Sequence, residues 1–338
     1  MRLTVSFLVS TLLSICLLGC ISAGTVVAAE KSSVVEGFTS LIIDGTNCGL
    51  LHSVSGGASC VEVVDNMNST GHFPQRYPRG SYCEPISLQI GIDIPKALRA
   101  WLADACNAVD TRKNGSVLYC DRTSRAVSEL QFTKALVTEV SLPACDKRSN
   151  EPGYLSISIE PLSTLLTPAS PNSPPAPART GEWRSCNFAL EIEGIDCSKV
   201  LSIEPITVKR QGGDLSNAVG GQAPTPITIV CSNLSVVLAN SSVPAWKEWI
   251  ARCAANKQPS KNGSLVFFDS AHKEITRIKL YGLIPCKLGP APNADGVGLA
   301  VAEISCDRAV FGAESTTGPA SGTMGGGASS TTTRPIGR

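Results

Sequence analysis

Histidine, aromatic and charged residues are scarce in this chain of 338 residues. Aromatic residues make up 5% of it and charged residues 17%, against roughly 25% charged residues in an average soluble domain. The three histidines, His52, His72 and His272, lie far apart in the sequence, so they do not suggest a metal site. The 29 basic and 28 acidic residues leave a formal net charge of +1, with no basic surplus for binding phosphates. We therefore expect no nucleic-acid partner, no metal and no cofactor.

Signatures of catalysis are also missing, because neither a Ser-His-Asp nor a Cys-His pattern is present. Asp121 and Asp269 recur in the two halves of the chain, as do Glu160 and Glu303, which would allow paired carboxylates for acid–base chemistry. Each of them stands at an expected strand end or turn, however, where acidic residues are usually solvated. We predict that the protein is not an enzyme.

Residues 1–29 have the features of a signal peptide, with Arg2 before an apolar run and small residues at 27–29. The apolar run is shorter than the roughly 20 residues that cross a membrane. Residues 17–20, Leu-Leu-Gly-Cys, also resemble a lipobox, in which Cys20 would be lipidated. The sequence thus predicts a secreted, periplasmic or cell-surface protein, with membrane attachment only if Cys20 carries a lipid.

Twelve cysteines follow the signal segment, an even number that indicates disulfides in an oxidising compartment. No C-x-x-C pair occurs, which argues against zinc ribbons and thioredoxin-like redox sites. The pairing is open, but we expect it to stay within each half of the chain. The disulfide candidates are Cys48, Cys60, Cys83, Cys106, Cys120, Cys145, Cys186, Cys197, Cys231, Cys253, Cys286 and Cys306.

Two low-complexity segments divide the rest of the chain. Residues 166–182 are rich in proline and predict an extended linker, and residues 313–338 are rich in Gly, Ser and Thr and predict a disordered tail. Because the C-terminal residues are polar, we expect no C-terminal lipid-anchor signal. We place one domain at 34–165 and a second at 183–312, with six of the candidate cysteines in each.

The two predicted domains repeat each other. Lys-Asn-Gly-Ser occurs at 113–116 and 261–264, and a tryptophan, Trp101 or Trp249, stands twelve residues before each lysine. Other matched segments are 41–45 with Cys48 against 190–194 with Cys197, and 85–90 against 226–231. This order over roughly 120 residues per half indicates an internal duplication.

Each repeat is expected to be mostly strand, with one helix. Apolar residues recur at helical spacing over 95–108 and 244–255, each after a proline, whereas 188–193 alternates as a strand does. We expect Trp101 and Trp249 to be core residues of these helices. Asn-Gly at 114–115 and 262–263 predicts a tight turn before a strand pair. The predicted fold class is mainly β, as two tandem small β-barrels or sandwiches with one helix each.

The second repeat resembles the tail tube proteins of contractile phages, a family related to type VI secretion tube proteins. The resemblance is carried by an ordered set: Ile-Glu-Gly at 192–194, Pro-Ile-Thr-Ile at 226–229, the helix with Trp249, and Lys-Asn-Gly-Ser at 261–264. Leu-Ile-Pro-Cys-Lys at 283–287 and Val-Ala-Glu-Ile at 301–304 complete it. The first repeat is more degenerate, with Val-Thr-Glu at 137–139 where Pro-x-Lys is expected.

The resemblance implies β-barrels that join edge to edge into a hexameric ring. Two units per chain then imply self-association as a trimer with pseudo-sixfold symmetry. We expect the hairpin 265–280 to supply the pairing edge. The predicted function is an exported structural protein that forms rings or tubes. The alternative is a secreted, disulfide-rich, monomeric binding or adhesin-like surface protein.

Overall fold

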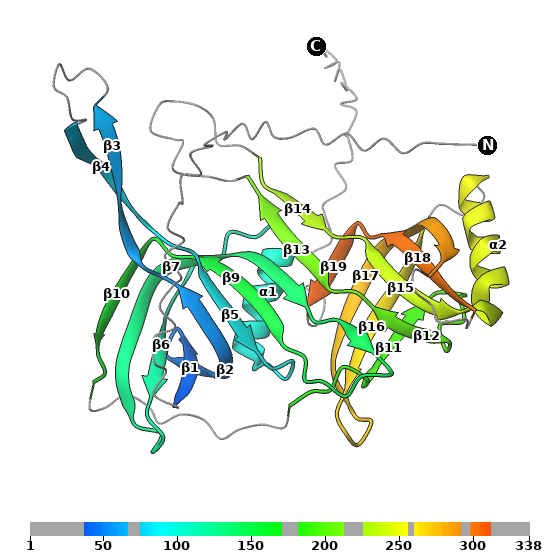
Figure 1. Cartoon of the computed structure of the whole chain (residues 1–338), viewed down its shortest axis with the longest axis horizontal. Helices are drawn as coiled ribbons and strands as arrows, with labels where there is room; N and C mark the ends of the chain where they lie inside the picture. Colours follow the sequence, from blue (N-terminus) through cyan, green and yellow to red (C-terminus); the bar gives the residue numbers. More distant parts are fainter. Residues whose placement is uncertain are drawn as a thin grey trace, which may run out of the picture. The chain divides into compact units, whose positions relative to one another are not determined.

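The computed structural model describes residues 37–66, 75–170, 182–212, 226–255, 260–291 and 298–311. Within them the chain is mainly β, with one α-helix in each half, so the predicted fold class is confirmed (Figure 1). Neither helix is long and apolar enough to cross a membrane. The predicted signal peptide, lipidation at Cys20, most of the proline-rich linker and the C-terminal tail lie outside the described residues.

The first half forms a closed barrel. Strands β7, β6, β1, β2, β5 and β9 pair in that order, and β9 pairs back to β7, so this circuit has no free edge. Its elements are β1 (Phe38–Ile43), β2 (Thr46–Gly56), β3 (Ser59–Asn66), β4 (Gln75–Cys83), β5 (Ile86–Ile90), α1 (Lys96–Cys106), β6 (Lys113–Cys120), β7 (Ala126–Leu142), β8 (Cys145–Asp146), β9 (Leu155–Glu160) and β10 (Ser163–Pro168).

The second half forms a nearly closed barrel in the order β11-β16-β17-β18-β15-β12, to which β8 of the first half adds as an edge strand. Its elements are β11 (Phe188–Ile192), β12 (Val200–Ile203), β13 (Ile206–Gln211), β14 (Thr228–Cys231), β15 (Leu234–Ala239), the 3-10 helix η2 (Asn240–Ser242), α2 (Val243–Ala254), β16 (Lys261–Phe268), β17 (Glu274–Pro290), β18 (Leu299–Ser305) and β19 (Arg308–Phe311).

The duplication is visible in the strand pairing. Both long strands, β7 and β17, have 17 residues, and each forms a hairpin with the strand that begins at Lys113 or Lys261. Ile43 pairs with Gly115 in the first half as Ile192 pairs with Gly263 in the second. The matched segments at 41–45 and 190–194 are therefore equivalent in the structure.

The match between 85–90 and 226–231 is wrong. β5 lies between β2 and β9, and the strand that lies between the equivalent β12 and β18 is β15, not β14. The error arose because β14 and β15 are both short, mainly apolar segments with the alternation of a strand, so the sequence pattern fits either one. The buried series of Ile86, Leu88 and Ile90 is repeated by Leu234, Val236 and Leu238 of β15.

The expected Asn-Gly turns are also wrong. Gly115 and Gly263 lie inside β6 and β16 and do not have positive φ. The turns lie instead at the end of the opening strand, where Gly45 has φ 79° and Gly194 has φ 67°. Gly115 is required for space: a Cβ there would lie 2.2 Å from the Ile42 carbonyl oxygen, and one at Gly263 would lie 2.5 Å from that of Glu191.

Tryptophans hold each helix on its sheet, as expected. Trp101 of α1 is 2% exposed, and Trp246 and Trp249 of α2 are 0% and 1% exposed, so all three belong to the buried core. Trp101 also donates its indole N–H to the Thr111 carbonyl oxygen at 2.8 Å. One continuous core cluster includes residues from both halves.

We predict that Gly115→Ala and Gly263→Ala each lower the free energy of unfolding by about 1–3 kcal/mol, because the new methyl group overpacks against a neighbouring strand. Urea unfolding measures the effect. Gly91→Ala is the matched control, since a Cβ at Gly91 meets nothing within 4 Å. Unchanged midpoints for the two test variants would contradict the steric explanation.

Candidate interaction surfaces

The cysteines do not form disulfides in the described residues, so the predicted disulfide framework stays a prediction. Several are deeply buried: burial raises the pKa of Cys48 to about 11 and that of Cys106 to about 12. Cys286, by contrast, is exposed on β17. Among the described residues, no group of His, Cys, Asp and Glu side chains is arranged to hold a metal ion.

The recurring acidic residues have separate structural roles. Asp121 and Asp269 each bind backbone N–H groups in the hairpin turn that follows β6 or β16. The predicted correspondence between Glu160 and Glu303 is wrong. Glu303 stands opposite Lys287, and the residue at the equivalent position of the first half is Ser158, which stands opposite Glu139. The four carboxylates do not form paired sites.

The two repeated motifs meet in both halves and fasten the opening strand to β6 or β16. Asp44 accepts from the Lys113 ammonium at 2.7 Å and from the Asn114 backbone N–H at 3.2 Å. In the second half, the Lys261 ammonium donates to the Glu193 carbonyl oxygen at 2.6 Å. The acidic-Gly and Lys-Asn-Gly motifs thus contact each other and hold the opening strand against β6 or β16. This structural role explains why both motifs recur, without any ligand.

The two halves of the chain are joined by strand addition. β13 of the second half pairs with the distal part of β7, on the edge opposite β9, and Lys209 forms an ion pair with Glu139 at 3.1 Å across this pairing (Figure 1). β19 packs against α1 of the first half. We call this contact, made by β13 and β19 with β7 and α1, the internal junction.

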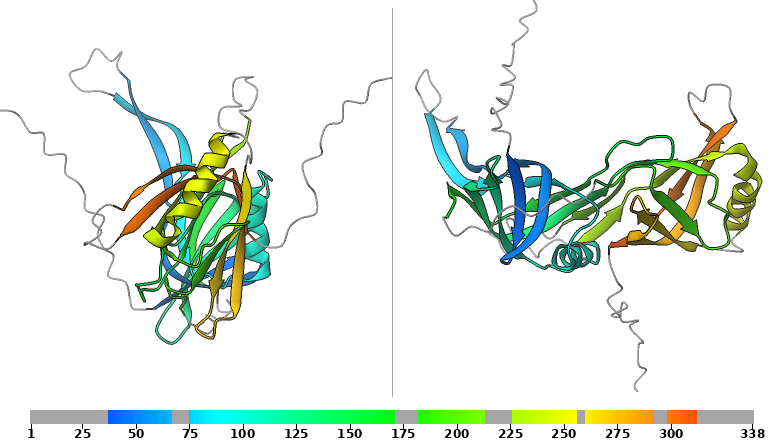
Figure 2. Two further views of the ribbon diagram at one scale, coloured as in Figure 1. Left: turned by 90° about the vertical axis from the view of Figure 1, so that its right-hand side faces the viewer. Right: turned by 90° about the horizontal axis from the view of Figure 1, so that it is seen from below.

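The first half carries the equivalent hairpin, β3 and β4, which pairs with no other described strand. Ser59 of β3 pairs with Cys83 of β4 as Val208 of β13 pairs with Cys231 of β14, and both hairpins follow the second strand of their repeat. In this register Val61 of β3 is the counterpart of Arg210 of β13, and Arg210 is 9% exposed whereas Val61 is 59% exposed. β3 and β4 form a separate two-stranded ribbon that extends away from the first barrel (Figure 2).

β10 differs from its counterpart β19 in the same way. β10 pairs with the proximal part of β7 as β19 pairs with that of β17, and this register makes Leu165 equivalent to Val310 and Leu166 equivalent to Phe311. Val310 and Phe311 are 4% and 3% exposed, but Leu165 and Leu166 are 59% and 65% exposed. We call the surface formed by β3, β4 and β10 the inserting face.

The distal part of β17 has a free edge. Leu288 and Pro290 pair with β18 on one side, and no described strand pairs with them on the other side. The equivalent edge of β7 is the one that β13 occupies. The expected edge hairpin 265–280 is therefore wrong, because β16 lies between β11 and β17 and the proximal part of β17 lies between β16 and β19. Pro285 and Pro290 limit the free edge to the four residues between them.

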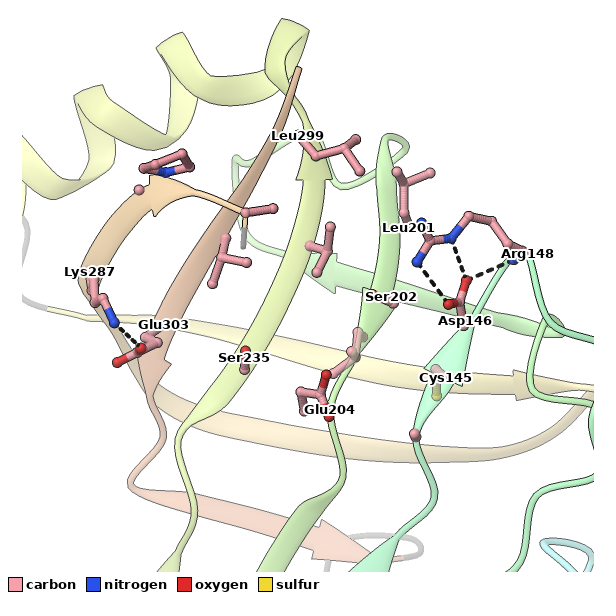
Figure 3. Close-up of a pocket in the computed structure, with 17 residues that line it drawn as sticks. Cys145, Asp146, Arg148, Leu201, Ser202, Glu204, Ser235, Lys287, Leu299 and Glu303 are labelled. Carbon is pink, nitrogen blue, oxygen red and sulfur yellow. Dashed lines mark hydrogen bonds and ion pairs between the residues drawn. The ribbon is translucent and has the colours of Figure 1, made fainter. Parts of the chain in front are cut away.

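A groove of about 890 Å³ lies on the outer face of the sheet next to this edge (Figure 3). Two ion pairs flank it, Asp146 with Arg148 at 2.9 Å and Lys287 with Glu303 at 2.6 Å. The Arg148 hydrogen bond lowers the pKa of Asp146, and the Glu303 hydrogen bond raises that of Lys287. Four half-buried apolar side chains line the groove, Leu201, Val237, Leu299 and Val301.

The fold does not require this apolar lining. At the position of Val237, opposite Ser202, the first half has Gln89, opposite Ser53. Ser53 donates to the Gln89 side-chain oxygen at 2.8 Å, which makes that surface polar. An apolar surface on one repeat only is typical of a contact site.

Helix α2 is covered less completely than α1. Leu102 and Cys106 of α1 are 0% and 1% exposed, whereas their counterparts in α2, Ile250 and Ala254, are half-buried and exposed. The described residues of the second half contain no element that covers α2 as β19 covers α1. We call α2, the free edge of β17 and the groove the receiving face.

Comparison with known proteins found structural neighbours only; no family model and no curated protein matches the chain. A chain of the anti-feeding prophage baseplate is 11% identical, with 38% of this chain and 91% of that chain covered and a TM-score of 0.34. A chain of an extracellular contractile injection system, the PVC sheath-tube complex in its extended state, is 15% identical, with 41% and 95% covered and a TM-score of 0.35. Hcp1 from Flavobacterium johnsoniae is 22% identical, with 39% and 96% covered and a TM-score of 0.28. The likeness to these chains is partial and concerns the fold alone.

We predict that the turn at Asp121 contributes to acid sensitivity. Asp121 accepts from the Thr123 hydroxyl at 2.6 Å and from the Thr123 and Arg125 backbone N–H groups, and the hydroxyl bond is the main cause of its lowered pKa. A lowered folded-state pKa adds stability above the ordinary value of 3.8, and that stability is lost as the pH falls through the folded-state pKa. Asp121→Asn, which keeps an acceptor oxygen, should flatten the fall in melting temperature below about pH 4.

Thr123→Val tests the cause of the shift. Removal of the hydroxyl donor should raise the folded-state pKa of Asp121, so the loss of stability should begin at a higher pH than in the wild type. Melting temperatures measured across the acid range check both variants. An acid limb that is the same in Asp121→Asn as in the wild type would show that this carboxylate is not linked to folding.

Proposed function

We propose that the protein is an exported, non-enzymatic assembly protein whose chains join head to tail by repeating the internal junction. The observation that carries this proposal is the contrast between equivalent residues. Val310 and Phe311 are buried at the internal junction, whereas their counterparts Leu165 and Leu166 are more than half exposed on the inserting face. A neighbouring chain that buried these leucines would remove apolar surface from water, the main driving force for association.

The inserting and receiving faces match because they are related by the duplication. Within one chain, β13 adds to the distal edge of β7 and β19 covers α1. The inserting face holds the counterparts of β13 and β19, and the receiving face holds the counterparts of β7 and α1. We propose that β3 of one chain adds to the free edge of β17 in the next, while β10 covers α2.

Repetition of one head-to-tail contact gives a ring when the rotation closes and a filament when it does not. Two repeats per chain favour a ring of three chains, in which six junctions alternate between internal and intermolecular. Such a ring leaves no inserting or receiving face exposed, which removes the liability of open strand edges. This supports the trimer with pseudo-sixfold symmetry.

Export rests on the sequence of residues 1–29, which lie outside the described residues. Twelve cysteines in the remaining chain fit an oxidising compartment. A secreted, periplasmic or cell-surface location is therefore part of the proposal, with membrane attachment only through a lipid on Cys20. No geometry in the described residues argues for catalysis, since Asp121 and Asp269 bind backbone N–H groups and Glu303 forms an ion pair with Lys287.

We predict that Leu165→Glu combined with Leu166→Glu abolishes assembly. Burying unpaired carboxylates at the contact should weaken association by at least about tenfold, because each uncompensated charge costs more than about 1.4 kcal/mol. Light scattering coupled to gel filtration measures the mass of the particle. Val109→Glu is the control: Val109 is 47% exposed but lies outside both faces, so this variant should assemble. A wild-type protein that stays monomeric at every concentration would refute the proposal and favour the adhesin-like alternative.

Raising the salt concentration distinguishes an assembly held by apolar and backbone contacts from one held by charged side chains. The net charge of +1 provides no long-range attraction between chains. The assembly should therefore keep its mass when salt is raised to about 0.5 M, since screening acts mainly on exposed charges. Dissociation in salt would show that exposed ion pairs hold the contact together.

A further inference from the structure

Two cysteines of the second half meet beside the internal junction. Cys231 is the last residue of β14, Cys306 precedes β19, and the two strands are neighbours. The Cys231 and Cys306 side chains interact with each other. Cys306 is 5% exposed, whereas Cys231 is only partly buried and accessible to a small reagent.

The first half shows that this proximity belongs to the repeat. Cys83, the counterpart of Cys231, places its sulfur 3.8 Å from the Leu162 carbonyl oxygen, in the segment that precedes β10. The register of β10 and β19 makes Pro161 the counterpart of Cys306. The hairpin cysteine thus lies against the same segment in both halves, but only the second half has another thiol there.

We propose that Cys231 and Cys306 form a disulfide that locks the β13–β14 hairpin to β19. The bond would join two elements of the second half that contact the first half, because β13 pairs with β7 and β19 packs against α1. Oxidation would then stabilise the internal junction, and the link would close a long loop whose freedom the unfolded chain loses.

Thiol–disulfide exchange with a small disulfide such as oxidised glutathione supplies the chemistry. One thiol of the pair loses its proton, and the thiolate attacks the donor disulfide and releases one donor thiol. The other cysteine, also deprotonated, attacks the sulfur of this mixed disulfide and releases the second donor thiol. Two cysteine thiols become one disulfide, and one donor disulfide becomes two thiols.

Ionisation of the pair favours this exchange. The interaction between the two thiols lowers the pKa of Cys306 and raises that of Cys231, so the first proton lost leaves a thiolate on Cys306. Cys106 of α1 is the competing thiol, since it also interacts electrostatically with Cys231. Cys106 is 1% exposed, and burial raises its pKa to about 12, which keeps it protonated and less reactive.

The test is peptide mapping of the full chain after incubation with oxidised glutathione and alkylation of the remaining thiols. We expect a peptide that links Cys231 to Cys306, its complete loss in Cys231→Ser, and its persistence in the control Cys106→Ser. In urea, oxidation should shift the unfolding midpoint of the wild type upward but not that of Cys231→Ser. A link from Cys231 to Cys106 would overturn the proposal. So would recovery of Cys231 and Cys306 as alkylated thiols from samples in which exposed Cys286 has reacted with glutathione.

Discussion

The backbone groups along the edges of the two 17-residue strands impose the main constraint on this structure. Each strand is longer than the hairpin partner beside it, so its distal part extends past β6 or β16 and needs a second partner on that edge. β7 obtains one from β13, in the other half of the chain. β17 has none among the described residues. The internal junction and the proposed intermolecular one follow from the same requirement.

The stability of the contact between such strands depends on burial of apolar side chains rather than on charge. The ion pair of Lys209 with Glu139 crosses the internal junction, but both side chains are substantially exposed, and exposed pairs contribute little stability. Ile206 and Val208 beside it are 1% and 4% exposed. The backbone hydrogen bonds position β13 against β7, and burial of Ile206 and Val208 makes the contact favourable. The inserting face carries apolar side chains in the corresponding elements, so the same division of roles is open to it.

Much of the fold could be predicted from the sequence, because helical spacing after a proline and alternation in strands are local signals. Both helices and the core positions of Trp101 and Trp249 follow from such signals. Wrong predictions arose where two explanations share one local pattern. Asn-Gly is common in turns, but here Gly115 is required by the carbonyl of Ile42 on the neighbouring strand, which no local pattern shows. The free edge of β17 depends on which strands lie beside it, so it could be found only from the structure.

The duplication allows one chain to do what a single repeat could not. A ring of identical single units would have identical junctions, and any stabilising bond would act on all of them. Here the internal junction has the thiol pair of Cys231 with Cys306, whereas the equivalent place in the first half has Cys83 beside the segment that contains Pro161. The proposed disulfide would therefore strengthen the junction within each chain and leave the proposed junction between chains reversible. In a ring with alternating junctions, dissociation would then release whole chains and would not separate the two halves of a chain.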